Sequence, residues 1–160
     1  MFYIAHRGNV NGPHEDENNP DYVAKALASG YDAEVDLWVD EEFKLWLGHD
    51  KPQYRTSVKF FNTYIDRLWI HCKNPQAMSQ MMYWTRSKNI SPNFFWHNTD
   101  DYTLTSYGYI WTYPGKKLTG NRSIAVMPES ADINVKDLMN ATGICTDQVE
   151  LFRFSVEHYR

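Results

Sequence analysis

The sequence predicts an α/β fold, a reduced TIM-type β/α barrel that forms one domain over residues 1–160. Two observations predict it. Short apolar runs alternate with stretches whose apolar residues recur at helical spacing, as expected for strand–helix units. Each apolar run also ends in polar or ionisable residues, and a barrel brings many strand ends to one mouth. Because a complete β/α barrel usually needs about 250 residues, we expect short connections and fewer than eight full β/α units.

The composition is that of a globular protein with a bulky interior, since aromatic residues make up 16% of the chain and hydrophobic residues 42%. The net charge of -4 gives no electrostatic attraction to nucleic acid or to an anionic membrane. The apolar runs are too short to cross a bilayer, and the apolar start of the chain is too short for a signal peptide. We therefore expect a cytoplasmic protein with no nucleic-acid partner and no stable membrane association.

The two cysteines, Cys72 and Cys145, lie far apart in the sequence, each within an apolar strand-like run. We expect buried free thiols rather than a disulfide. No paired Cys or Cys/His spacing in the sequence predicts a zinc cluster.

The first third of the chain predicts a strand, a helix and a hairpin. Residues 2–5 predict a short buried strand and residues 8–20 a loop. Asn19 is the expected N-cap of a helix that begins at Pro20, and Gly30 is a natural stop at its end. Residues 31–39 and 43–48 predict two strands joined as a hairpin.

The rest of the chain predicts shorter elements. Residues 51–66 are expected to be irregular or weakly helical, and residues 101–106 to be a plain connection. The predicted helices span residues 75–87 and 134–139, and the tail from 149 to 160 is a helix or a strand. The predicted strands span residues 68–70, 93–96, 109–111, 123–127 and 143–145.

Ionisable side chains follow the ends of most of these strands. Glu34 and Asp36 are two residues apart, so both point to one face of their strand, with Val35 and Leu37 on the other. Two carboxylates held together repel each other unless a cation lies between them. A barrel would gather the following residues at its mouth: His6, Glu34, Asp36, His49, His71, Lys73, His97, Glu129 and Asp147.

Four motifs in the first third of the chain resemble those of the glycerophosphodiester phosphodiesterase family, within the phosphatidylinositol-specific phospholipase C-like superfamily. They are His6-Arg7-Gly8, Glu17-Asn18, Glu34-Val35-Asp36 and His49-Asp50, in the order and spacing of the family. Thr146-Asp147 resembles the end of the closing strand of the family. Because four linked motifs are far more specific than one, the chain is similar to a short, divergent member.

The resemblance implies a metal-dependent phosphodiesterase that hydrolyses a small glycerophosphodiester-like substrate. His6 and His49 would be the general acid and base, and imidazole suits both roles because its pKa lies near neutral pH. Glu34 and Asp36 would hold a divalent metal ion, Mg²⁺ or Ca²⁺ first and Mn²⁺ as the alternative. Glu17 would complete the metal site or orient Arg7.

The third strand departs from the family pattern. The family has a glutamate two residues before a lysine, whereas this chain has His71 before Lys73. A neutral imidazole can bind a metal, but it removes one negative charge and favours softer metals than magnesium or calcium. Three alternatives follow: His71 is a ligand, Glu129 or Asp147 takes its place, or the metal is bound weakly.

The remaining candidates would bind the substrate. Arg7 and Lys73 are the expected phosphate-binding residues, Arg7 as a bidentate fork and Lys73 as a point charge. The others are expected to line the site: His97 and Trp111 at strand ends, with Glu129 and Asp147.

Two other functions stay open. One is a catalytically weakened phosphodiester-binding module that lost turnover with the third acid. The other is a lyase-type lipid phosphodiesterase resembling sphingomyelinase D, which the lack of evident apolar docking loops disfavours. The alcohol of the substrate, the preferred metal and the oligomeric state are open as well.

Overall fold

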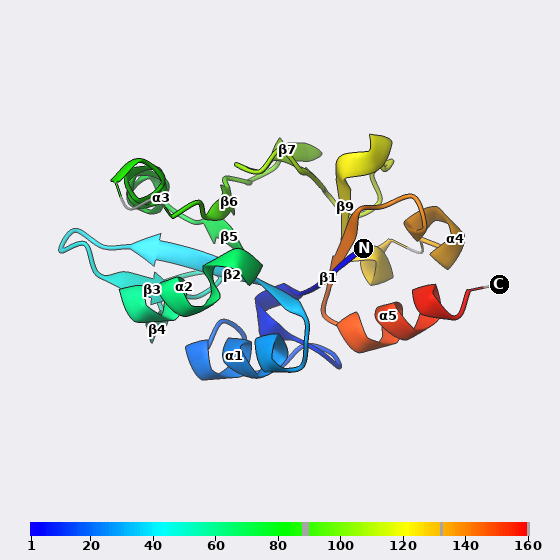
Figure 1. The fold of residues 1–160 in the computed structure, drawn as a ribbon, viewed down its shortest axis with the longest axis horizontal. Helices are drawn as coiled ribbons and strands as arrows, with labels where there is room; N and C mark the ends of the chain where they lie inside the picture. The colour runs from blue at the N-terminus through cyan, green and yellow to red at the C-terminus, as the bar shows by residue number, and fades with distance from the viewer. Residues whose placement is uncertain (88–89, 132, 160) are drawn as a thin grey trace.

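The computed structural model describes residues 1–87, 90–131 and 133–159. Its centre is a curled, mixed β-sheet, which within these residues has ten strands (Figure 1). The strands are β1 (Phe2–Ala5), β2 (Asp32–Val39), β3 (Leu45–Leu47), β4 (Tyr54–Arg55), β5 (Leu68–Cys72), β6 (Asn93–Phe95), β7 (Tyr102–Leu104), β8 (Ile110–Thr112), β9 (Ser123–Val126) and β10 (Gly143–Thr146). The α-helices are α1 (Pro20–Ala28), α2 (Val58–Tyr64), α3 (Pro75–Ser87), α4 (Val135–Leu138) and α5 (Val149–Glu157).

Parallel strands form the body of the sheet, in the order β6, β5, β2, β1, β10, β9, β8. Antiparallel strands extend it in two places. β7 pairs with β8, while β3 pairs with the distal half of β2 and then with β4. Short 3-10 helices occupy some of the strand ends and connections, namely η1 (His6–Gly8), η2 (Ile65–Arg67), η3 (Gly120–Arg122) and η4 (Pro128–Ser130).

The predicted reduced TIM-type β/α barrel is wrong. A β/α barrel closes a ring of parallel strands, each followed by a helix. Here β6 is followed by the antiparallel strand β7, and β8 by the 3-10 helix η3. Among the described residues no ladder pairs β6 with β7 or β8, so the sheet curls into part of a barrel without closing as one (Figure 1). A chain of 160 residues is too short for eight strand–helix units of the usual size, about 250 residues in all.

Local sequence signals nevertheless placed most elements correctly. The Asn19 side chain accepts a hydrogen bond from the Asp21 N–H at 3.0 Å and Pro20 begins α1, as predicted. Gly30 follows the helix with φ 93°, a value that an L-residue adopts only with strain. The predicted hairpin is confirmed by the antiparallel register Leu37 opposite Leu47.

Two segments differ from the expectation, and the tail takes one of the two forms predicted for it. Residues 102–104 form strand β7 where a plain connection was predicted, and residues 54–55 form the short strand β4. The tail is the helix α5 as far as Glu157, with Arg160 outside the described residues. Both short strands form because they pair with a neighbouring strand. Such pairing cannot be predicted from the residues of the short segment alone.

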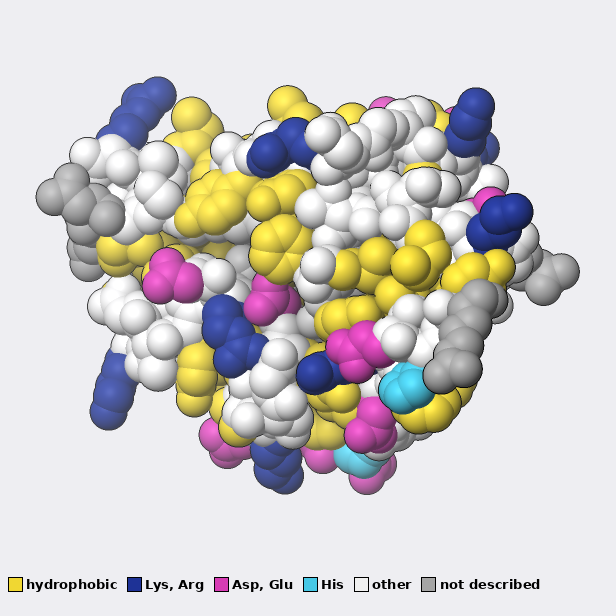
Figure 2. All heavy atoms as spheres, turned by 45° about the vertical axis from the view of Figure 1, so that its right-hand side comes forward, with side chains coloured by type: hydrophobic (Ala, Val, Ile, Leu, Met, Phe, Trp, Pro, Cys, Tyr) yellow, Lys and Arg dark blue, Asp and Glu magenta, His cyan; other side chains and the backbone are white. Residues whose placement is uncertain are grey.

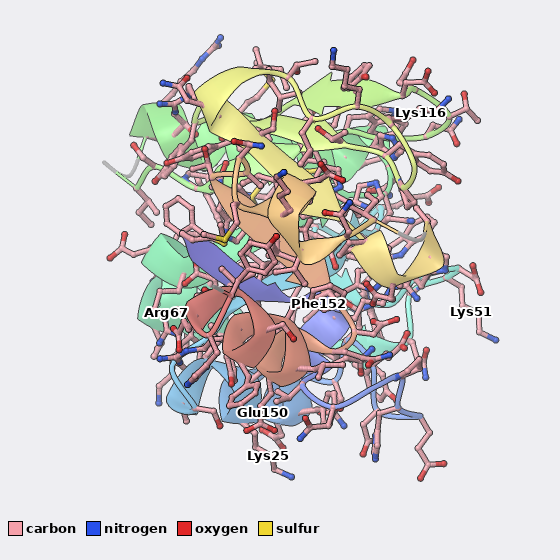
Figure 3. All side chains as sticks on the ribbon, turned by 90° about the vertical axis from the view of Figure 1, so that its right-hand side faces the viewer. Lys25, Lys51, Arg67, Lys116, Glu150 and Phe152 are labelled. Atoms are coloured by element: carbon pink, nitrogen blue, oxygen red, sulfur yellow. The ribbon has the colours of Figure 1, made fainter. Side chains whose placement is uncertain are left out.

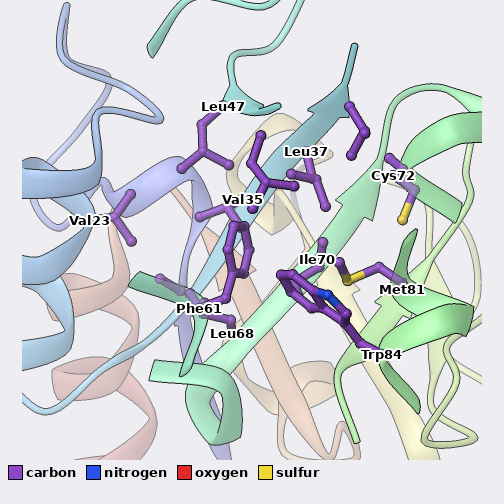
Figure 4. Packing of buried hydrophobic residues seen from close by; sticks show 14 of the residues in the cluster. Val23, Val35, Leu37, Leu47, Phe61, Leu68, Ile70, Cys72, Met81 and Trp84 are labelled. Carbon is purple, nitrogen blue, oxygen red and sulfur yellow. The ribbon is translucent and has the colours of Figure 1, made fainter. Parts of the chain in front are cut away.

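Helices α1, α2 and α3 cover the outer face of the sheet around β2 and β5 (Figure 1). Figure 4 shows Phe61 from α2 lying beside Val35 of β2, with Trp84 from α3 next to it. The Phe61 and Trp84 rings are 5.5 Å apart at an edge-to-face angle. Burying each such side chain contributes about 1.5–3 kcal/mol. The outer face of β2 is therefore the main core, and Val35 and Leu37 belong to it as predicted.

Aromatic side chains fill the inner, concave face of the sheet. Phe95 lies 4.5 Å from Trp111, and Trp111 lies 6.0 Å from Trp69, measured between ring centroids. Trp111 is 5% exposed within this cluster. It therefore packs in the core of the concave face, whereas the sequence predicted that it lines the mouth of the site.

The carboxyl ends of the parallel strands gather on one side of the molecule. Figure 3 shows Arg67, which precedes β5, on the side opposite Lys116, which follows β8. Cys72 and Cys145 are buried free thiols, as predicted. On the face drawn in Figure 2, charged side chains are scattered among exposed hydrophobic ones. None of the described helices combines the length and apolar character that a membrane crossing needs.

Candidate metal and acid–base site

Strand register brings three metal-binding side chain types together on the concave face. Asp36 of β2 and His71 of β5 are direct partners in the parallel ladder, so their side chains stand side by side. Glu34 lies two residues before Asp36 and points to the same face. One ligand atom from each of Glu34, Asp36 and His71 lies within 4.8 Å of the others. We call these three residues the Glu-Asp-His trio.

Two contacts that do not involve the carboxylates hold the ring of His71 in its orientation. Its Nε2 lies 2.9 Å from the carbonyl oxygen of His97, which can only accept, so Nε2 carries a hydrogen. The ring stacks on Phe95 with 5.1 Å between centroids and 10° between planes. Nδ1 then faces the carboxylates, 3.1 Å from Asp36 and 3.8 Å from Glu34. It either carries a second proton paired with Asp36 or presents its lone pair to a cation.

Asp36 is a buried carboxylate with several partners. The Nζ of Lys73 lies 3.4 Å from Oδ1, and the Nε of Arg7 lies 3.3 Å from Oδ2. Burial would raise the pKa of Asp36, but the hydrogen bond and charge of His71, with Lys73 and Arg7, lower it well below its usual range. Asp36 is thus ionised at neutral pH although it is 1% exposed.

The pKa of Glu34 is shifted in the opposite direction to that of Asp36. Burial and the neighbouring Asp36 charge raise its pKa above the ordinary value, and His6, His71 and Arg7 offset this only in part. Its Oε2 accepts the N–H of Arg7 at 3.3 Å. Two adjacent carboxylates with opposite pKa shifts are typical of a site where a cation, or a shared proton, sits between them.

Asn18 holds Asp36 in place, a role that the sequence did not reveal. Its Nδ2 donates to Asp36 Oδ2 and its Oδ1 accepts the Asp36 N–H, both at 2.9 Å. The residue is buried and has φ 67°, the left-handed region that asparagine tolerates better than most residues. The only sequence signal was its place in the Glu17-Asn18 motif.

Glu17 orients Arg7 and lies outside the Glu-Asp-His trio. Its Oε2 accepts from Arg7 Nη1 and its Oε1 accepts from Asn9 Nδ2, both at 2.9 Å. The structure therefore favours the second of the two roles expected for Glu17. Asn9 was missed by the sequence reading; it also donates to Asp147 and accepts from the Tyr22 hydroxyl.

His6 lies at the end of β1 and is paired with Asp147 at the end of β10. The register of Ala5 opposite Thr146 makes the two residues neighbours. His6 Nδ1 donates to Asp147 Oδ1 at 2.8 Å, so Nε2 is left for other partners. Burial would lower the pKa of His6, but the bond to Asp147 and the charge of Glu34 outweigh it and raise that pKa.

Glu129 accepts hydrogen bonds from the end of β10, next to this pair. It accepts the Thr146 hydroxyl at 2.7 Å and the Asp147 N–H at 3.0 Å. Its other oxygen is buried and has no hydrogen-bond partner among the described residues. Glu129 therefore fixes the end of β10, while Asp147 acts on His6; neither joins the Glu-Asp-His trio in place of His71.

His49 lies at the rim of the site. Its side chain is 44% exposed and its Nδ1 lies 2.7 Å from Asp50. Partial burial and the positive charges of Arg7 and Lys73 lower its pKa, against the opposing effect of Asp36. His49 and Arg7 line a polar pocket of about 220 Å³, together with Glu17 and Asn18.

His97 contributes through its backbone. Its carbonyl accepts from His71, while its ring bonds to the Asp100 carbonyl at 2.6 Å and stacks on Tyr113. Of the residues that the sequence singled out, all but Trp111 lie in or around this network.

The site has fewer fixed positive charges than carboxylates. The carboxylates that contact Arg7, Lys73, His6 or His71 are Glu17, Glu34, Asp36 and Asp147, against the two fixed cations Arg7 and Lys73. Four negative charges less two positive ones leave two. One divalent cation would balance these two charges.

Comparisons of the chain with family models, curated proteins and solved structures give no match. What the chain does is therefore argued from the geometry and electrostatics of this site.

Proposed function

We propose that the protein is a metal-dependent phosphodiesterase acting on a small phosphodiester that carries a free hydroxyl, such as a glycerophosphodiester. The observation that carries this proposal is the combination of the Glu-Asp-His trio with Arg7 and Lys73 directly beside it. Phosphodiester cleavage needs positive charge against the phosphoryl oxygens and two groups that move protons.

The residues fit a divalent cation. Three ligand atoms of suitable type converge, and the hydrogen bond from His71 to the His97 carbonyl orients the imidazole as such bonds do in metal sites. A bound divalent cation would polarise a phosphoryl oxygen and neutralise charge that develops during the reaction.

The two histidines have complementary pKa shifts. The pKa of His6 is raised by Asp147 and Glu34 against the effect of burial, so His6 keeps its proton to higher pH and can donate it to the leaving alkoxide. The pKa of His49 is lowered by burial and by Arg7, so His49 is neutral near pH 7 and can take the proton of the attacking hydroxyl. Opposite shifts on a pair of titratable groups are how acid and base roles are separated.

Arg7 and Lys73 have a second role besides binding Asp36. Each contacts only one oxygen of that carboxylate, so donors remain for phosphate oxygens. Glu17 accepts from the guanidinium of Arg7 and is itself held by the amide of Asn9, which keeps Arg7 at the site.

The test compares two substrates with different leaving groups in the presence of Mg²⁺, Ca²⁺, Mn²⁺ or Zn²⁺. Glycerophosphocholine has a poor alkoxide leaving group, whereas hydroxypropyl nitrophenyl phosphate releases a nitrophenolate that needs no proton. We expect His49→Gln to slow both reactions by roughly 10²–10⁴-fold, and His6→Gln to slow the first far more than the second. His158→Gln is the matched control, because His158 lies in the exposed tail and bonds only to the Phe154 carbonyl among the described residues.

Wild-type protein that hydrolyses neither substrate with any of the four metals would rule out the proposal. Tight binding of a non-hydrolysable phosphonate by such an inactive protein would instead support the phosphodiester-binding module. Activity confined to lysophospholipid substrates would support the lipid phosphodiesterase.

A further inference from the structure

We infer that the Glu-Asp-His trio selects a transition metal, Zn²⁺ or Co²⁺ before Mn²⁺, over Mg²⁺ and Ca²⁺. The inference rests on the proposed function only in taking Glu34, Asp36 and His71 as one metal site. It follows from the donor atom that His71 puts there and from how firmly that atom is held.

The donor atoms of the trio favour a transition metal. Mg²⁺ and Ca²⁺ bind oxygen ligands, Ca²⁺ six to eight of them. The trio offers two carboxylates and one imidazole nitrogen. Imidazole suits zinc, cobalt and related metals, and the affinity of a mixed nitrogen and oxygen site rises from Mn²⁺ through Co²⁺.

The ring of His71 is held in one orientation. The hydrogen bond to the His97 carbonyl at 2.9 Å assigns the hydrogen to Nε2, and stacking on Phe95 holds the ring plane. The neutral ring therefore has its lone pair on Nδ1, the atom that faces both carboxylates. This arrangement sets both the tautomer and the direction of the nitrogen ligand before a metal arrives.

Glu34 is buried but accepts few hydrogen bonds. It is 2% exposed, yet among the described residues it accepts a single hydrogen bond, at 3.3 Å from the Arg7 N–H to Oε2. Its Oε1 lies 3.8 Å from His71 Nδ1, beyond hydrogen-bond distance. The carboxylate of Glu34 therefore keeps lone pairs that a cation can bind.

Lys73 competes with a cation for Oδ1 of Asp36. Its Nζ lies 3.4 Å from Asp36 Oδ1, the oxygen that His71 approaches at 3.1 Å. A metal that binds this oxygen must displace the ammonium group or share the oxygen with it. Removing the charge of Lys73 should therefore strengthen metal binding, whereas removing His71 should weaken it.

The experiment measures metal binding by the full chain without substrate. Protein stripped with a chelator is titrated calorimetrically with Zn²⁺, Co²⁺, Mn²⁺, Mg²⁺ and Ca²⁺, and Co²⁺ binding is followed by its visible absorption. We expect Zn²⁺ and Co²⁺ to bind at least about 10-fold more tightly than Mg²⁺ or Ca²⁺. We expect His71→Ala to lose at least about 10-fold in Zn²⁺ affinity, because loss of even an outer partner of a metal ligand costs this much.

Two further variants keep the result interpretable if His71→Ala folds poorly. His71→Glu should shift the preference towards Mg²⁺ and Ca²⁺, and Lys73→Gln should tighten Zn²⁺ binding. His14→Ala is the control for adventitious surface binding, because His14 is an exposed histidine that also lies beside a carboxylate, that of Asp16.

The inference is overturned if Mg²⁺ or Ca²⁺ binds as tightly as Zn²⁺, or if His14→Ala lowers Zn²⁺ affinity as much as His71→Ala does. Zn²⁺ binding that depends on His71 in a protein without phosphodiesterase activity would support the inference while defeating the proposed function. Hydrolysis that depends on His6, with Mg²⁺ bound more tightly than Zn²⁺, would do the reverse.

Discussion

At the scale of single residues, Asp36 explains how the site tolerates a buried charge. Removing a carboxylate from water costs several kcal/mol unless partners compensate. Asp36 has two cationic side chains, one imidazole and both groups of the Asn18 amide around it. Its lowered pKa means that this contribution to stability is present above pH 3.8, the ordinary value, and is lost as the pH falls through the folded-state pKa.

His6 gives the clearest pH-dependent prediction. Its folded-state pKa is raised above 6.5, so the His6–Asp147 pair stabilises the fold fully below pH 6.5 and less as the pH rises through the folded-state pKa. We expect Asp147→Asn to remove this stabilisation and to lower the pKa of His6, because burial and Arg7 then act with less opposition. Urea unfolding at pH 5.5 and pH 8, with NMR titration of the His6 ring, measures both effects.

The control for this prediction is Asp50→Asn, which changes the exposed partner of His49. That substitution should leave the His6 titration unaltered. An unchanged His6 pKa in Asp147→Asn would mean that the pairing at the ends of β1 and β10 is not what raises it.

At the scale of elements, the two-residue period of β2 organises the whole site. Val35 and Leu37 pack under the helices on the outer face, while Glu34 and Asp36 face inward. This alternation could be predicted from sequence alone because the direction of a side chain on a strand is a local property. The partner of Asp36 could not, because the register with His71 is set by the neighbouring strand.

Gly48 connects strand β3 to His49 and provides a prediction at this scale. Its φ is 155°, and a Cβ built at this position would collide with the Lys51 carbonyl oxygen. We expect Gly48→Ala to destabilise the fold by roughly 2–4 kcal/mol, because backbone strain and overpacking add. It should also reduce activity by displacing His49. Chemical denaturation and steady-state kinetics measure the two effects.

Gly30→Ala is the matched comparison. Gly30 also has a positive φ, 93°, but a Cβ there meets no atom within 4 Å. Gly30→Ala should lower the free energy of unfolding by about 1 kcal/mol, from backbone strain alone, and leave the kinetics unchanged. Equal costs for the two substitutions would show that the close approach of Lys51 does not matter.

At the scale of the whole molecule, one sheet separates two interiors. The outer one is aliphatic and aromatic, built on β2 and β5 beneath three helices, and the inner one is the aromatic cluster below the ionisable site. Phe95 of this inner cluster stacks on the ring of His71, so the cluster supports one member of the Glu-Asp-His trio directly.

The outer core should determine global stability. Phe61 is fully buried between β2 and α3, and we expect Phe61→Ala to cost about 3–5 kcal/mol from lost burial and the cavity left behind. Phe154→Ala serves as the control, since Phe154 is 60% exposed and its truncation should cost no more than about 0.5 kcal/mol. Urea-induced unfolding followed by tryptophan fluorescence measures both. Comparable losses in the two variants would contradict this division of the core.

The sequence by itself determined the local features: the strands and helices marked by apolar period, the cap at Asn19, the hairpin after β2 and the inward face of Glu34 and Asp36. These depend on residues close together in the chain. The strand-end pattern fits a closed barrel, and this was the fold predicted. It fits an open sheet equally well, because the carboxyl ends of parallel strands meet at one edge in both folds. Whether a sheet closes depends on how distant strands pair.

Only the tertiary structure decided which distant residues meet. It paired Asp147 with His6, placed His71 against Asp36, assigned Glu17 to Arg7 and buried Trp111 in the core. Each of these contacts joins residues far apart in sequence or depends on the curl of the sheet. Contacts of this kind are set by register and packing across the whole molecule, which no short stretch of sequence encodes.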